Sequence, residues 1–165
     1  MNHNNIETER KFLVRSDAFL ARAVKAYRIK QGYIAHDGGN TVRVRIRDNQ
    51  GFLTIKGPSL DGMSRFEWER EIPLQDAEAL TALCHGFIDK TRYLVPAEGM
   101  SPAGTERFFE VDVFHGANEG LVMAEIELER PDEPFARPDW LGEEVTGDRR
   151  YYNAYLIGNP YTLWK

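Results

Sequence analysis

The sequence predicts an α+β fold in which about eight antiparallel β-strands form a barrel and a few helices pack outside it. Strand-like segments recur along the whole chain of 165 residues, and turn-like sequences such as DGGN and DNQG separate neighbours. Helical patterns are fewer. Charged and apolar residues alternate in most of the strand-like segments. A closed sheet would place the charged faces in a central bore and the apolar faces outside, against the helices.

The alternation predicts the strands in chain order. The first, IETERKFLV, has Glu7, Glu9 and Lys11 on one face. The expected strands cover residues 6–14, 28–36, 41–48, 52–57, 64–73, 87–95, 106–114 and 121–130.

Three helices are expected between and after the strands. The first begins at a cap formed by Ser16 or Asp17 and runs to about Tyr27. The other two cover residues 75–85 and the segment DRRYYNAYLIG, which ends at Gly158. The Pro- and Gly-rich stretch VPAEGMSPAGTE is expected to be a loop between two strands. We find no linker and no repeat, so residues 1–165 are expected to form one domain.

Composition narrows the class of protein. The chain has 26 acidic and 21 basic residues and a net charge of −5, which argues against a nucleic-acid partner. It has no apolar run of the roughly 20 residues that a membrane helix needs. The polar start lacks the apolar core of a signal peptide, so the cytoplasm is the expected location. Cys84 is the only cysteine, which excludes an internal disulfide. A homodimer is left open.

The charges on the strand faces are sorted by sign. TVRVRIRD carries only arginines on its polar face, whereas FFEVDVF and AEIELER carry only acids. An open sheet with one solvated face would explain the alternation. It would also mix the signs, because like charges on one strand face repel each other. The sorting therefore favours a closed bore.

A bore of this kind needs a charged ligand. Each ion withdrawn from water costs several kcal/mol, whereas a whole domain is stable by only about 5–15 kcal/mol. Clustered Glu and Asp side chains suit the hard cations Mg²⁺ and Mn²⁺. Clustered Arg and Lys side chains suit phosphate. Acids on one wall and bases on the other indicate a polyphosphate that is bridged to metal.

The segment ETERK, from Glu7 to Lys11, resembles the Glu-x-Glu-x-Lys signature of the triphosphate tunnel metalloenzymes, also called the CYTH superfamily. Further segments match in the same order over nearly the whole chain: QGYIA, TVRVRIR, FLTIKG, SRFEWEREI, KTRY, FEVDVFHG, AEIELE and GEEVTGDRRYYN. The chain most resembles the short bacterial members. The resemblance implies an eight-stranded antiparallel tunnel that acts on triphosphates with a divalent metal, Mg²⁺ or Mn²⁺.

The resemblance also implies two sets of site residues. Arg10 and Arg70 have the opposite strand parity and are expected to face outward. The expected ligands of substrate phosphate are Lys11, Arg43, Arg45, Lys56, Arg65, Lys90, Arg92 and Arg150. The expected metal side is Glu7, Glu9, Glu67, Glu69, Glu110, Asp112, Glu125 and Glu127.

The expected reaction is hydrolysis of a short-chain triphosphate, with inorganic tripolyphosphate giving pyrophosphate and phosphate. Phosphoryl transfer needs positioning and charge neutralisation more than covalent help from the protein. A class IV adenylate cyclase and a thiamine or nucleoside triphosphatase use the same kind of site and are left open. A module that binds polyphosphate without turnover is the alternative of another class. The acids argue against it, because anion capture alone needs only bases.

The general base is the least determined part of the site. No histidine falls in a motif. The two candidates are metal-bound water and Lys90, whose pKa would fall beside Arg92, Arg43 and Arg45. In the second case Tyr33 would orient Lys90 by accepting a hydrogen bond or relaying a proton.

Overall fold

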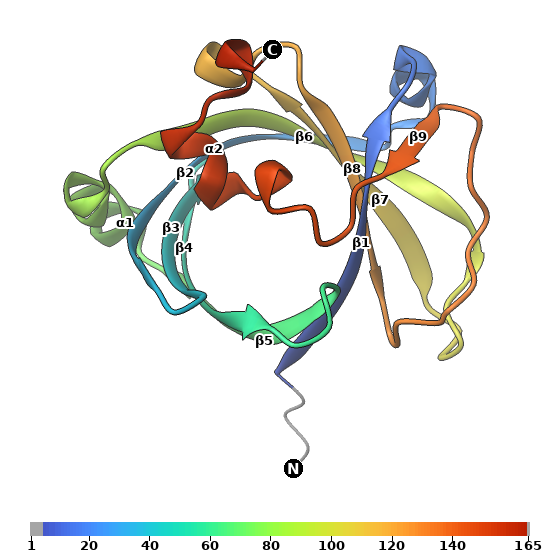
Figure 1. The fold of residues 1–165 in the computed structure, drawn as a ribbon, viewed down its shortest axis with the longest axis horizontal. Helices are drawn as coiled ribbons and strands as arrows, with labels where there is room; N and C mark the ends of the chain where they lie inside the picture. Colours follow the sequence, from blue (N-terminus) through green and yellow to red (C-terminus); the bar gives the residue numbers. More distant parts are fainter. Residues whose placement is uncertain (1–4, 165) are drawn as a thin grey trace.

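Eight antiparallel strands close into a barrel in the computed structural model, which describes residues 5–164 (Figure 1). The sheet order is β5-β4-β3-β2-β6-β7-β8-β1-β9, and a further pairing of β5 with β1 closes the ring. This confirms the predicted eight-stranded barrel. The strands are β1 (Ile6–Val14), β2 (Lys25–Asp37), β3 (Asn40–Arg47), β4 (Gln50–Ser59), β5 (Ser64–Ile72), β6 (Phe87–Met100), β7 (Glu106–Phe114), β8 (Val122–Leu128) and β9 (Leu141–Glu144).

The seam of the barrel lies along β1. Its first part, Ile6 to Thr8, pairs with β5, and its last part, Phe12 to Val14, pairs with β9. Its other edge pairs with β8. The segment after β9 then returns to the seam, where the backbone N–H of Val145 donates to the carbonyl of Lys11.

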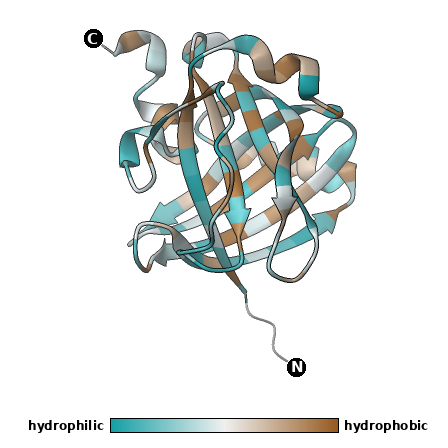
Figure 2. Ribbon diagram, turned by 90° about the vertical axis from the view of Figure 1, so that its right-hand side faces the viewer, coloured by the Kyte–Doolittle hydropathy of each residue, from teal (hydrophilic) through white to brown (hydrophobic). Residues whose placement is uncertain are grey.

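Along each strand, side chains alternate between the inside and the outside of the barrel. Successive side chains point to opposite faces of a strand, so the charged rows of the sequence share the inner face. Figure 2 shows the resulting change of hydropathy from residue to residue along the strands.

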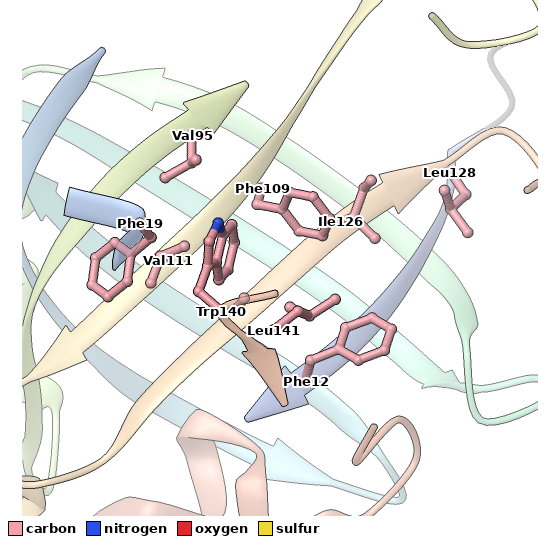
Figure 3. Packing of buried hydrophobic residues seen from close by; sticks show 10 residues of the cluster. Phe12, Phe19, Val95, Phe109, Val111, Ile126, Leu128, Trp140 and Leu141 are labelled. Carbon is pink, nitrogen blue, oxygen red and sulfur yellow. The ribbon is translucent and has the colours of Figure 1, made fainter. Parts of the chain in front are cut away.

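The main apolar core lies outside the barrel wall, as Figure 3 shows. Phe12 of β1, Phe109 of β7 and Ile126 of β8 are each exposed by 1% or less. Trp140 covers them, and its ring centroid lies 5.2 Å from that of Phe109 and 5.9 Å from that of Phe19. The segment that follows β8 and a short 3-10 helix, Asp17–Arg22, therefore form an outer layer over this part of the wall.

The inner face becomes apolar at one end of the barrel. Ile88 and Phe114 are buried there, although they share strand faces with charged residues. The helix α2 (Asn153–Gly158) lies within the outline of the ring in Figure 1, and its Leu156 packs against both residues. Leu156 has no exposed surface. The C-terminal segment therefore fills this end of the barrel.

Several boundaries differ from those that the sequence predicts. The first helix ends at Arg22 because β2 already begins at Lys25, so the expected extension to Tyr27 was wrong. The expected loop at residues 95–106 is largely strand, because β6 continues to Met100. The second helix, α1 (Leu74–Leu80), ends in a 3-10 turn at Thr81–Leu83.

The last helix is also shorter than expected, and one strand was missed. A 3-10 turn, Arg149–Tyr151, precedes α2. The strand β9, of four residues, was not predicted. No helix within residues 5–164 is long and apolar enough to cross a membrane.

Candidate active site

A cavity of about 800 Å³ occupies the bore, and charged side chains dominate its lining. Its walls come from strands that are far apart in the sequence, including β1, β3, β5 and β8. The expected site residues that line it are Glu7, Glu9, Lys11, Tyr33, Arg43, Arg45, Lys56, Arg65, Glu67, Glu69, Lys90, Arg92, Glu110, Glu125 and Glu127.

The acids gather where β1 lies between β5 and β8. Glu9 is directly opposite Glu127 in the β1–β8 register, and Lys11 is opposite Glu125. Lys56 of β4 is opposite Glu67 of the neighbouring β5, and its Nζ lies 2.7 Å from Glu7 Oε2 and 3.2 Å from Glu67 Oε2. Two lysines, Lys56 and Lys11, thus neutralise part of an acidic wall.

The remaining negative charge on this wall is not compensated. Burial raises the pKa of Glu9 well above its ordinary value, and Glu125 and Glu7 add to the rise. Partial withdrawal from water in the bore, with the charges of Glu7 and Glu110, raises the pKa of Glu127 to about 7. These carboxylates therefore lie in an environment that favours an added positive charge.

The basic wall, in contrast, carries positive charge that its acidic neighbours only partly compensate. Arg43 lies 3.4 Å from Glu69, and Arg92 binds Glu110 and Asp112 at 2.8 Å. Arg45 has no ion-pair partner among the described residues, and its Nε donates instead to Gln31 Oε1 at 2.8 Å. Burial lowers the pKa of Arg45 to about 9, and Arg43 and Arg92 contribute to the fall. An anion at this position would relieve the repulsion.

Lys90 lies at the inner end of the cavity, where the apolar part of the barrel begins. It is 1% exposed, and its Nζ lies 2.7 Å from Asp112 Oδ2 and 2.9 Å from Asn153 Oδ1. Burial lowers its pKa to about 7 against the opposing effect of Asp112, and Arg92 contributes to the fall. The sequence anticipated the direction from like charges, but burial is the larger cause.

Two expected site residues are not at the cavity. Asp112 is 2% exposed and lies behind the lining, where both of its oxygens are held by Arg92 and one of them also by Lys90. Its short side chain has the inward parity but ends beneath longer neighbours. Arg150 is exposed and binds Asp148. Its neighbour Arg149 lines the cavity instead.

Other lining residues were missed by the sequence reasoning. Gln31 has the inward parity of its strand and could have been found from that signal. His36 of β2 also lines the cavity, although no histidine falls in a sequence motif. Asn153 and Thr146 come from the C-terminal segment, whose course no periodicity reveals.

Arg10 and Arg70 lie outside the bore, as their parity predicts. Arg10 makes a two-pronged contact with Glu144 of β9, and its guanidinium lies over the ring of Phe135. This hydrogen bond lowers the pKa of Glu144 to about 2. Arg70 stacks on Trp68 of its own strand.

Comparison with known proteins agrees with the geometry. The CYTH domain family model matches residues 5–152. The chain belongs to the CYTH domain family. An inorganic triphosphatase of Acetivibrio thermocellus is 47% identical over 96% of this chain and 97% of its own length. An inorganic triphosphatase of Nitrosomonas europaea is 37% identical over 91% of this chain and 95% of its own length.

Solved structures show the same fold. A crystal structure of an inorganic triphosphatase superposes with a TM-score of 0.60 at 34% identity and covers 92% of this chain and 97% of that chain. A protein from Pyrococcus furiosus, 21% identical, superposes with a TM-score of 0.59 over 76% of this chain and 80% of its own. CYTH proteins are metal-dependent, so the charged bore is a candidate site for a divalent cation and its substrate.

Proposed function

We propose that this protein is an inorganic triphosphatase that hydrolyses tripolyphosphate to pyrophosphate and phosphate with a divalent cation. One observation carries the proposal: the same cavity holds Arg45, which has no acidic partner within residues 5–164, and two carboxylates with raised pKa values, Glu9 and Glu127. A complex of a metal ion with a triphosphate would supply the missing charge on both walls. The relatives named inorganic triphosphatase support the same activity.

The donor set on the acidic wall fits a hard cation. Within residues 5–164, no three acidic, histidine or cysteine side chains converge closely enough to form a complete metal site. The fit therefore rests on carboxylate oxygens, which Mg²⁺ and Mn²⁺ prefer, and on the uncompensated charge. When bound, the cation would neutralise phosphate oxygens and stabilise the charge that develops on the leaving pyrophosphate. The proposed ligands are Glu7, Glu9, Glu67, Glu125 and Glu127.

The basic wall would hold the phosphate groups. Arg43 and Arg45 can each bind two oxygens of one phosphate, whereas Lys56 and Lys11 act as point charges. Arg92 already donates to Asp112 and Glu110, so it would add positive charge and its remaining N–H groups. We extend the set by Arg149, which replaces Arg150 because only Arg149 lines the cavity. Arg65 also lines the cavity, but its guanidinium already donates to the carbonyls of Gly57 and Gly39. It would act on substrate entry rather than on the bound phosphates.

Lys90 is our candidate for the general base. A water molecule attacks the terminal phosphorus, the bridging P–O bond breaks, and pyrophosphate leaves with the bond electrons. The proton of the attacking water passes to the neutral amine at Lys90 Nζ. A base is most effective when its pKa lies near the working pH, which the pKa of about 7 satisfies.

Turnover is therefore expected to rise with pH through about 7, because only the neutral amine accepts a proton. Lys90→Arg keeps the positive charge and removes the base, so turnover should be lost at every pH. Glu127 titrates in the same range, and Glu127→Gln is the control, in which the rise should persist. Profiles of kcat against pH for the three proteins decide the assignment. A normal profile in Lys90→Arg would remove Lys90 from this role.

A substrate panel tests the proposed function itself. Phosphate release is measured from tripolyphosphate, ATP and thiamine triphosphate with Mg²⁺ or Mn²⁺, and cyclic AMP is assayed in parallel. We expect tripolyphosphate to be hydrolysed with the highest kcat/KM and activity to vanish in excess EDTA. Cyclic AMP formation, preference for an organic triphosphate, or binding without turnover would contradict the proposal.

The single cysteine suits a reducing compartment, and we propose the cytoplasm as the location.

A further inference from the structure

Two side-chain amides connect the C-terminal helix with the reactive end of the cavity. Gln31 of β2 is 1% exposed, and its Nε2 donates to Asn153 Oδ1 at 3.3 Å. The same oxygen accepts from Lys90 Nζ at 2.9 Å. The oxygen of the same Gln31 amide, Oε1, accepts a hydrogen bond from Arg45 Nε at 2.8 Å. Arg45, Gln31, Asn153 and Lys90 thus form one continuous chain of hydrogen bonds.

The direction of every hydrogen bond in this chain is fixed. Arginine only donates, so the Gln31 amide must turn its oxygen toward Arg45. An amide oxygen only accepts, so the Asn153 oxygen accepts from Lys90 whether the amine is charged or neutral. The Gln31 amide group is then forced to point its nitrogen toward Asn153 and toward the hydroxyl of Tyr33, which lies at 3.4 Å. Tyr33 accepts this bond, which leaves its own hydrogen free to point into the cavity. Within the described residues, Tyr33 and Lys90 are linked through these amides and share no direct hydrogen bond.

Apolar packing sets the position of Asn153. It is the first residue of α2, and Leu156 of the same helix is fully buried against Ile88 and Phe114. Ile88 lies on the same face of β6 as Lys90, two residues before it. The helix therefore enters the barrel beside the lysine, and seating it brings the Asn153 amide to the amine.

We propose that Asn153 and Gln31 are positioning residues, which hold Lys90 Nζ in a fixed place relative to Arg45 and Tyr33 once α2 is seated in the barrel. Lys90 has a flexible four-carbon stem, and its contact with Asp112 alone restrains it from one side. The amide oxygen supplies the second restraint. Closure of this end of the barrel and assembly of the reactive groups are then the same event. The consequence for turnover rests on the proposed function.

The first test removes the amide and follows catalysis. Asn153→Ala is expected to lower kcat for tripolyphosphate by about tenfold to a hundredfold, with KM changed by less than about threefold, because a small displacement of a reacting group has effects of this size. The matched control is Asn159→Ala, because Asn159 is an exposed asparagine at the other end of α2, bonded to the carbonyl of Tyr155. Equal losses in both variants, or an unchanged kcat in Asn153→Ala, would overturn the proposal.

The second test measures how firmly the Lys90 side chain is held and does not depend on enzymatic activity. The two Hε protons of a lysine held in one place have different NMR shifts, and these merge when the side chain moves freely. We expect separate signals for Lys90 in the wild type and in Asn153→Asp, which keeps an acceptor oxygen, and merged signals in Asn153→Ala. Separate signals in Asn153→Ala would contradict the proposal even if the wild type did not hydrolyse tripolyphosphate.

A further variant covers the case in which Asn153→Ala does not fold. Gln31→Met keeps the volume of the side chain and removes all three hydrogen bonds of the amide, to Tyr33, Asn153 and Arg45. It should lower kcat and broaden or merge the Lys90 Hε signals, and KM should rise as well, because Gln31 also holds Arg45 of the phosphate site. A wild-type kcat together with wild-type Lys90 signals in this variant would overturn the proposal.

Discussion

Lys11 and Phe12 are neighbours on β1, yet they belong to different regions of the molecule. Lys11 faces the cavity 3.6 Å from Glu125, whereas Phe12 points outward and has no exposed surface in the aromatic cluster under Trp140. The outer region is apolar and closely packed, and it supplies hydrophobic stabilisation. The inner region brings together charges that repel one another and lose hydration, which opposes folding. The barrel wall is therefore stabilised from outside, so that its interior is available for ligand binding.

The largest expected effect comes from breaking the outer region. Trp140→Ala should lower the free energy of unfolding by about 3–5 kcal/mol, because it removes a ring that is 6% exposed and packed against Phe19 and Phe109. Urea unfolding measures the loss, and Leu163→Ala, at a site that is 73% exposed, is the control with little change. At a temperature where the variant is folded, KM for tripolyphosphate should stay close to the wild-type value. A large rise in KM would contradict the separation of the two regions.

Inside the bore, we expect a substitution to weaken substrate binding with little loss of stability. Arg45→Ala should weaken substrate binding by about 1.5–3 kcal/mol, or roughly tenfold to a hundredfold, because charge-assisted hydrogen bonds are lost. Its stability should change little or rise, since Arg43 and Arg92 repel the guanidinium. Calorimetric titration with tripolyphosphate checks the affinity, and Arg70→Ala on the outer face is the matched control. Similar affinities in the two variants would place Arg45 outside the phosphate site.

A smaller effect concerns the pH dependence of stability without metal. The pKa of Glu127 is raised from 4.5 to about 7 in the folded protein, so the folded state holds this proton more tightly than the unfolded state. Stability should therefore fall as pH rises from about 5 to 7, on the order of 1 kcal/mol after solvent screening. Melting temperatures in EDTA measure it, and the fall should shrink in Glu127→Gln and on addition of Mg²⁺ or Mn²⁺. The same fall in all three samples would assign it to other groups.

The strands and their charged faces could be predicted because a period of two residues decides both. This is why Glu7, Arg43 and Lys56 were correctly placed at the bore lining. The depth of a side chain does not follow from parity. Asp112 has the right parity, but it is too short to pass Lys90 and Arg92 and ends behind them.

The C-terminal part of the site could not be predicted in detail. Arg149 and Arg150 are adjacent in a 3-10 turn, and only the turn geometry decides which one faces the cavity. The role of Asn153 depends on packing between α2 and strands that are distant in the sequence. Tertiary contacts, rather than local patterns, determine these positions.

The most direct test of the account is one substitution with two readouts. Glu9→Gln keeps the volume of a side chain that is held among Glu7 and Glu125 and removes its charge. If the inner acids serve catalysis at the expense of stability, turnover of tripolyphosphate at saturating metal should fall by about tenfold or more, because a carboxylate ligand is lost. The melting temperature of the metal-free protein at pH 8 should stay the same or rise. Unchanged turnover together with a lower melting temperature would show instead that Glu9 supports the fold, and would contradict the account.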